Sequence, residues 1–310
     1  MRMTLFAKGL LGLLLLLGSV PAMAQSDYTK TKYPIVLVHG VFGFDRLVGS
    51  YDYFFMIPQE LRAGGARVYT ANVSSTNSNS LRGEQLIEEL ETLRALYGFR
   101  KFNLIGHSQG GLTARYVASV RPDLVASVTS VGSPHFGSKT ADAVDVAAPN
   151  ATLRRTILAG FANAFSNFIE FLSADGDPQD AVAALNSLTT RGLTTFNRTH
   201  PQGMPTQSCG SGASLVNNVR YYSVGGTSVS TNLLDPIDLG LVATSLAFAG
   251  SASDGLVGRC SSHWGTVLRD DYGWNHMDEV NQTLALRGLF ATNPVSFYRS
   301  QANRLRGIGL

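Results

Sequence analysis

The stretch Phe102-Asn103-Leu104-Ile105-Gly106-His107-Ser108-Gln109-Gly110-Gly111 decides the fold. A short apolar run meets the pattern Gly-x-Ser-x-Gly, and a helix-like run follows over residues 112–120. A strand that turns sharply into a helix lifts a serine hydroxyl clear of the sheet, and the flanking glycines leave room for that turn. The pattern alone also arises by chance in a chain rich in Gly and Ser, so an ordinary Gly-rich turn is the alternative. The strand–turn–helix context favours Ser108 as a nucleophile.

Other apolar, β-branched runs predict further strands that are buried on both faces of a sheet. They cover residues 33–38, 67–71, 125–131 and 219–224, with helical spacing at 54–63 and 81–97. Strands that alternate with helices predict an α/β fold with a mostly parallel central sheet and helices on both faces. Such sheets bind ligands at the carboxyl ends of their strands. His39, Ser108 and Ser133 all follow such an end.

Residues 1–24 have the pattern of a cleaved export signal. Arg2 and Lys8 form a basic start, residues 10–17 are apolar, and Ala22-Met23-Ala24 is a cleavage pattern. The apolar run is too short to span a bilayer, although an uncleaved anchor is the alternative. We therefore expect secretion by way of the periplasm. The remaining residues 25–310 are expected to form one domain, because no repeat or low-complexity linker interrupts them.

The composition of the mature part argues against nucleic-acid binding. Removing two basic residues from 25 leaves 23 against 22 acidic residues, so the net charge is +1. The mature part also holds both cysteines, Cys209 and Cys260. One pair of cysteines in an exported protein predicts one disulfide, with two free thiols as the alternative.

A long insertion separates the strands predicted at 125–131 and 219–224. Apolar residues recur every three or four positions over residues 153–172, and Phe161, Phe165 and Phe168 are among them. This spacing predicts an amphipathic helix with an aromatic face. Two interpretations remain open: the face packs on the core, or the helix is a lid that opens at a lipid surface.

A nucleophilic serine needs a base and an acid that orients the base, and in α/β enzymes of this kind they follow the serine in the order acid, then histidine. The downstream histidines are His135, His200, His263 and His276. His276 fits best, because it lies in a late loop that enters a helical run predicted over residues 277–289.

Asp254 is the favoured acid, because an Asp-Gly turn would hold its carboxylate at a loop tip; Asp235 and Asp271 are competitors. In this hypothesis His276 deprotonates Ser108, and Asp254 fixes the imidazole. The backbone amides of Val41 and Gln109 would bind the oxyanion.

Several motifs in combination resemble the secreted true lipases of the Pseudomonas and Burkholderia type. They are Tyr-Pro-Ile-Val-Leu-Val-His-Gly from Tyr33, Gly-His-Ser-Gln-Gly-Gly from Gly106, Gly-Ser-Pro-His-Phe-Gly-Ser from Gly132, Asp-Gly-Leu-Val from Asp254, Trp-Asn-His-Met-Asp-Glu-Val-Asn-Gln from Trp274, and Ala-Asn-Arg-Leu from Ala302. The resemblance covers nearly the whole mature chain. It implies an α/β-hydrolase fold and a triacylglycerol lipase.

The same resemblance implies roles for particular residues. Ser108, Asp254 and His276 would form the triad, Val41 and Gln109 the oxyanion hole, residues 151–174 the lid, and Cys209 and Cys260 the disulfide. One structural calcium ion would be held by Asp235, Asp278, Gln282 and Leu286. Asp278, Gln282 and Leu286 would share one face of the predicted helix, and two carboxylates, two carbonyls and two waters would suit Ca²⁺. From spacing alone, Asp278 is equally an acid favoured in the first turn of a helix.

The resemblance also implies a dedicated foldase and type II secretion, and we expect a monomer. Two other functions use the same fold. A soluble carboxylesterase or polyester hydrolase would share the triad. A non-catalytic exported binding protein is disfavoured by a complete Ser/Asp/His set in the right order.

Overall fold

The computed structural model describes residues 26–41, 46–47, 51–145, 152, 155–156 and 180–310. The predicted signal, residues 1–24, lies outside this set, and the predicted lid, residues 151–174, lies almost wholly outside it. None of the helices that are described is long and apolar enough to cross a bilayer.

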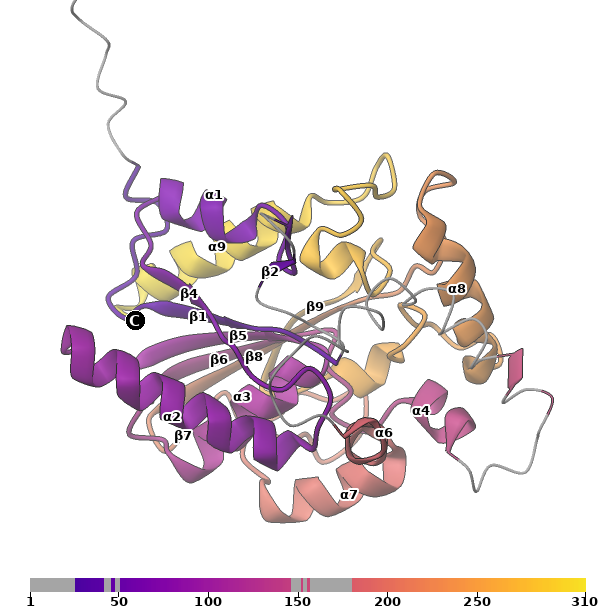
Figure 1. Ribbon diagram of the computed structural model, residues 1–310, viewed down its shortest axis with the longest axis horizontal. Coiled ribbons are helices and arrows are strands. Elements are labelled where there is room, and N and C mark those ends of the chain that lie inside the picture. The colour runs from indigo at the N-terminus through magenta and orange to yellow at the C-terminus, as the bar shows by residue number, and fades with distance from the viewer. Residues whose placement is uncertain (1–25, 42–45, 48–50, 146–151, 153–154, 157–179) are drawn as a thin grey trace, which may run out of the picture.

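A twisted, mostly parallel sheet forms the centre of the molecule, as predicted (Figure 1). Its order is β4-β1-β5-β6-β8, with β7 antiparallel and β9 parallel to β8. The strands are β1 (Ile35–Val38), β4 (Val68–Thr70), β5 (Phe102–His107), β6 (Val125–Val131), β7 (Leu215–Val216), β8 (Val219–Gly226) and β9 (Thr266–Tyr272). A separate pair, β2 (Arg46–Leu47) and β3 (Tyr51–Asp52), is antiparallel.

Helices cover both faces of the sheet, because alternate residues of each strand point to opposite sides. Val36 and Val38 pack with α2 (Asn79–Tyr97) and α3 (Gln109–Val120) on one face. Ile35 and Leu37 pack with α1 (Ile57–Ala63) and α9 (Pro294–Gly307) on the other. The strands are therefore buried on both sides, which explains their continuous apolar sequences.

The remaining helices gather at the carboxyl end of the sheet. They are α4 (Lys139–Val144), α6 (Ala181–Leu188), α7 (Thr190–Thr199) and α8 (Pro236–Ser245), with the short 3₁₀ turns η1 (Leu246–Phe248), η2 (Arg259–Ser262) and η3 (Asp278–Val280). Cys209 and Cys260 are joined in a disulfide, which confirms that prediction.

Two sequence predictions differ from the structure. The helix predicted over residues 277–289 is wrong: after η3 the chain turns, with Asn281, Leu284 and Ala285 at positive φ. Side chains of this turn bond inward instead: Asn281 Nδ2 donates to the carbonyl of Phe55, and Gln282 Nε2 donates to the carbonyls of Asp52 and Tyr53. Strand β9 was missed, because Arg269, Asp270 and Asp271 break its apolar pattern at the edge of the sheet.

Candidate active site

Ser108 occupies a strained turn between β5 and α3. Its backbone has φ 54° and ψ −126°, a conformation that residues other than glycine rarely adopt. The turn is tight because glycines flank it: a Cβ on Gly106 would lie 2.3 Å from the carbonyl oxygen of Gly110. A Cβ on Gly110 would lie 2.0 Å from the carbonyl oxygen of Val38. This geometry requires the glycines of the sequence motif.

His276 and Asp254 lie together although 22 residues separate them. His276 Nδ1 is 2.8 Å from Asp254 Oδ2, and the His276 backbone N–H donates to the Asp254 carbonyl at 2.9 Å. The other carboxylate oxygen, Oδ1, accepts from the backbone N–H groups of Leu256 and Val257, at 2.8 and 2.6 Å. Three donors therefore fix this carboxylate in the Asp-Gly turn.

The turn that carries His276 is held by an amide that the sequence did not suggest. Asn275 Oδ1 accepts from the backbone N–H groups of Met277 and Asp278, and Asn275 Nδ2 donates to Asp238 Oδ1 at 2.7 Å. Asp238 also accepts from two backbone N–H groups of the 231–232 turn. This buried network fixes the histidine loop against the start of α8.

The loop after β1 reaches the serine closely. A Cβ on Gly40 would lie 2.8 Å from Ser108 Cβ, so only glycine permits the approach. Val41, the next residue, borders the same cavity as Ser108. Gln109 is the first residue of α3, where a backbone N–H has no partner within the helix and the helix dipole favours negative charge. Its side chain donates away from the site, to Asn77 O and Asn79 Oδ1.

Arg82 of α2 supports that loop and was missed in the sequence. It is fully buried, and its guanidinium donates to the carbonyls of His39, Gly40 and Ser74. Burial lowers the pKa of Arg82 to about 9. Burial, followed by the charge of Arg82, lowers the pKa of His39 to about 3, so His39 is neutral. A single Arg within a helical pattern gives no sequence signal for such a role.

A second buried acid, also missed, lies beside the histidine. Glu279 Oε2 is 3.2 Å from His107 Nε2 and 3.9 Å from His276 Nδ1. Burial and the neighbouring Asp254 raise the pKa of Glu279 well above its usual range, whereas burial lowers the pKa of His107. Tyr53 Oη bonds His107 Nδ1 at 2.7 Å. Ligand-type atoms of His107, His276 and Glu279 lie within 4.8 Å of one another, a grouping that could hold a metal ion.

The other candidate bases and acids lie elsewhere. His135 stacks on Trp264 and bonds Ser130 Oγ, His200 bonds Ser119 Oγ, and His263 bonds Asp270. Asp271 is paired with Arg269 near the surface. These contacts account for each side chain without reference to Ser108.

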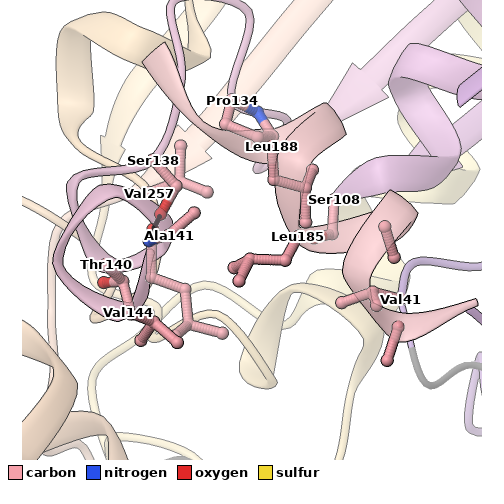
Figure 2. A pocket seen from close by; sticks show the side chains of 13 residues that line it. Val41, Ser108, Pro134, Ser138, Thr140, Ala141, Val144, Leu185, Leu188 and Val257 are labelled. Carbon is pink, nitrogen blue, oxygen red and sulfur yellow. Dashed lines mark hydrogen bonds between the residues drawn. The ribbon is translucent and has the colours of Figure 1, made fainter. Parts of the chain in front are cut away.

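A cavity of about 240 Å³ opens beside Ser108 (Figure 2). Its wall is apolar: it includes Pro134, Ala141, Val144, Ala181, Ala184, Leu185, Leu188, Leu256 and Val257. Ser138 and Thr140 also line the wall, and their hydroxyls are turned to the backbone: Ser138 Oγ donates to Leu256 O at 2.6 Å and Thr140 Oγ1 to Thr244 O at 3.5 Å. Leu185 of α6 points into the cavity in Figure 2. The cavity therefore suits a hydrocarbon chain.

Asp235 and Asp278 form a separate buried acidic pair. Asp235 Oδ2 and Asp278 Oδ1 are buried and have no hydrogen-bond partner among the described residues. Burial, together with the charges of Asp238 and Asp235, raises the pKa of Asp278 to about 7. Thr283 Oγ1 donates to Asp235 Oδ1, which ties the 283–286 turn to this pair. Two unsatisfied carboxylate oxygens are a donor set for a hard cation.

The chain belongs to the α/β-hydrolase family, whose family model matches residues 33–258. Solved structures share the fold at low sequence identity. A metagenomic carboxyl esterase superposes with a TM-score of 0.59 at 16% identity, covering 89% of this chain and 76% of its own. A mature Bacillus licheniformis lipase gives 0.56 at 19%, with coverage of 82% and 89%.

Relatives of much higher identity are triacylglycerol lipases. The one from Vibrio cholerae is 52% identical over 94% of this chain and 93% of its own length. Those from Pseudomonas fragi and Burkholderia plantarii are 45% and 42% identical, covering 92% and 93% of this chain and 100% and 90% of their own. The resemblance to Pseudomonas and Burkholderia lipases is thereby confirmed.

Proposed function

We propose that this protein is a secreted triacylglycerol lipase that hydrolyses long-chain esters at a lipid–water interface. One observation carries the proposal: the serine of a strained strand–helix turn borders an apolar cavity, in a fold that also brings His276 and Asp254 together. The relatives named triacylglycerol lipase support the substrate class.

The mechanism follows from the positions of the side chains. Asp254 accepts the Nδ1 proton of His276, which leaves Nε2 to take the proton of the Ser108 hydroxyl. Ser108 Oγ then attacks the ester carbonyl, and the oxyanion that forms is bound by the N–H groups of Gln109 and Val41. His276 returns the proton to the leaving alcohol, and an acyl-enzyme remains. Water, activated by the same histidine, releases the fatty acid.

The acyl chain is proposed to occupy the cavity beside Ser108. Its wall offers aliphatic side chains, and the hydroxyls of Ser138 and Thr140 already bond backbone carbonyls. Burying a hydrocarbon chain there contributes about 0.8 kcal/mol for each CH₂ group. A soluble carboxylesterase or polyester hydrolase with the same triad is the second candidate. The volume and apolar wall of the cavity favour the lipase.

We also propose a calcium ion at Asp235 and Asp278. The unpartnered oxygens Asp235 Oδ2 and Asp278 Oδ1 support it. A neutral oxygen of Gln282 and the backbone carbonyl of Leu286 would complete the set. The resemblance implied these calcium ligands, and Asp278, Gln282 and Leu286 were expected to share one helix face. The expected helix face is wrong, because residues 277–289 do not form a helix. Bound calcium would neutralise the two acids and hold the loop that follows His276, so its role would be structural.

Export and assembly remain predictions. The signal-like residues 1–24 support secretion by way of the periplasm, and a disulfide suits an oxidising compartment. A foldase partner rests on the resemblance to the Pseudomonas and Burkholderia lipases, and a monomeric state stays an expectation.

Labelling of the serine tests the proposed mechanism. An organophosphonate should modify Ser108 in the native protein, and Ser108→Ala should lose labelling and lower kcat by about 10⁵-fold or more. Peptide mapping by mass spectrometry locates the modified residue. Label retained on another serine in Ser108→Ala, together with retained ester hydrolysis, would remove Ser108 from the mechanism.

A further inference from the structure

Helix α8 is apolar on both sides. Its inner side packs through Ile237 and Leu241 against Leu256. On its outer side Leu239 is 80% exposed and Val242 is 44% exposed. A helix that is apolar all round is usually covered on every side or lies against lipid. The outer face of α8 is therefore unusual for a helix in contact with water.

Exposed apolar side chains continue beyond both ends of α8 and onto the neighbouring loop. Asn232 Nδ2 donates to the carbonyl of Arg287 at 3.1 Å, which joins the chain before α8 to the 287–290 loop. We use the term apolar rim for the exposed set Leu233, Leu234, Leu239, Val242, Leu246, Leu289 and Phe290.

The rim lacks charge along its main segment. Between residues 233 and 252 the chain has two charged side chains, Asp235 and Asp238, and both are buried. Every exposed residue in that range is Leu, Val, Pro, Ala, Gly or Ser. Contiguous apolar surface of this kind marks an interaction site on a protein.

The inner side of α8 meets the wall of the cavity beside Ser108. Leu256, which packs under α8, also lines that cavity. Thr140 of α4 donates to the carbonyl of Thr244 in α8, and Figure 1 shows α4 and α8 at the same end of the molecule. The outer face of α8 thus lies about one helix diameter, roughly 10 Å, from the cavity wall.

We propose that the apolar rim is a lipid-contact surface that holds the protein on aggregated acylglycerol with the cavity facing the lipid. This inference rests on the proposed function and adds a surface to it outside residues 151–174. A neutral lipid fits better than an anionic one, because residues 233–252 hold no Lys or Arg to pair with anionic headgroups. Arg287, on the neighbouring loop, is half-buried and donates to the carbonyl of Ala285. Transfer of exposed leucines into the lipid supplies the binding energy.

Binding to emulsified triolein tests the rim. In an inactive Ser108→Ala background, Leu239→Gln/Leu246→Gln should weaken binding about tenfold or more, since two large apolar side chains no longer leave water. Leu289→Gln/Phe290→Gln should act in the same direction. Glutamine is a good helix former, so the exposed substitutions on α8 and at the start of η1 should leave the fold intact.

The matched control is Leu96→Gln/Val120→Gln. Leu96 is 68% exposed and Val120 is 40% exposed. They lie at the carboxyl ends of α2 and α3, and these ends are opposite the Ser108 edge of the sheet because the helices run against the strands. The control should bind triolein as the parent does. With Ser108 present, all variants should hydrolyse dissolved p-nitrophenyl acetate at the parental rate.

Three results would contradict or separate the proposals. If the rim variants bind triolein as tightly as the control does, the rim is not a lipid-contact surface. A second outcome is that the parent sediments as a dimer, whereas the rim variants are monomers that bind triolein as the parent does. The rim would then be an interface between copies of this chain, not a lipid-contact surface. A parent chain that binds triolein through the rim but does not hydrolyse it would refute the proposed function and leave the rim standing.

Discussion

Arg82 is the residue whose removal should reveal most about how the site is held. Within the described part of the chain its polar contacts go to neutral groups, chiefly the backbone carbonyls of His39, Gly40 and Ser74. A buried guanidinium with this arrangement satisfies several backbone acceptors at once, and it fixes the chain that enters Val41.

Replacing that guanidinium should cost both stability and rate. Arg82→Met keeps an unbranched apolar side chain but removes the guanidinium and leaves buried carbonyls without donors, so the free energy of unfolding should fall by about 3–5 kcal/mol. Among molecules that remain folded, kcat should fall more than KM changes. Urea unfolding measures the loss of stability, and steady-state kinetics measure the loss of rate. Arg82→Lys should give values between those of the parent and of Arg82→Met. A loss of stability under about 1 kcal/mol would show that the loop does not depend on this residue.

At the residue scale, some residues of the candidate site could be predicted from the sequence and others could not. Asp254 and His276 could be named because chain order and an Asp-Gly turn restrict the choice, and the structure does bring them together. Glu279 and Asp238 could not be named. A carboxylate in a helical or turn pattern usually faces water, and only the folded chain shows that these two are buried.

Among the elements, the turn from β5 to α3 has the strictest steric requirement. Val38, His39 and Gly110 meet where the sheet passes under the helix start, and a Cβ on Gly110 would lie 2.0 Å from the Val38 oxygen. The close approach sets the distance between the strand and the helix, and thereby the height of Ser108 above the sheet.

Adding one methyl group should disrupt this turn. Gly110→Ala should lower the free energy of unfolding by more than about 3 kcal/mol, because backbone atoms must shift to admit the new carbon. Gly307→Ala is the control: among the described residues, no atom beyond its chain neighbours and its own helix backbone lies within 4 Å of the new methyl group, and the change falls at the end of α9. Differential scanning calorimetry compares the two. Equal melting temperatures would mean that the turn has more room than this geometry allows.

The loop after His276 shows where element prediction failed. Its apolar spacing suggests a helix, yet Asn275 bonds two N–H groups at the loop start and Asn281 turns the chain at positive φ. Side chains that compete for backbone donors explain the failure. Strand β9 escaped prediction for a related reason, since an exposed edge strand can carry charges.

Removing the proposed calcium ion should loosen this loop. If the free calcium concentration is about 100 times the Kd of the site, removing the ion should lower the free energy of unfolding by about 2.7 kcal/mol and lower Tm by several degrees. Calorimetry with EDTA, followed by added Ca²⁺ and then by Mg²⁺ as the mismatched ion, measures the shift. Chelation without effect on Tm, and no metal in the protein by mass spectrometry, would exclude calcium from the account.

For the molecule as a whole, the class of fold was the most predictable feature. Buried strands alternate with helices from residue 33 onward, and the observed sheet has the expected parallel centre. The cavity was not predictable, because its wall combines α4, α6 and the Asp254 turn, which are distant in sequence. The predicted lid, residues 151–174, lies almost wholly outside the described residues and stays a prediction.

The most direct test of the central claim is the rate of hydrolysis as a triglyceride passes its solubility limit. Tributyrin, measured at constant pH from dissolved monomer to emulsion, covers the range. An interface-active lipase should show low rates on dissolved substrate and a steep rise once the emulsion forms, because apolar surface near the cavity binds the lipid phase. A plain hyperbolic curve that saturates below the solubility limit, with no rise above it, would contradict the lipase and favour a soluble esterase.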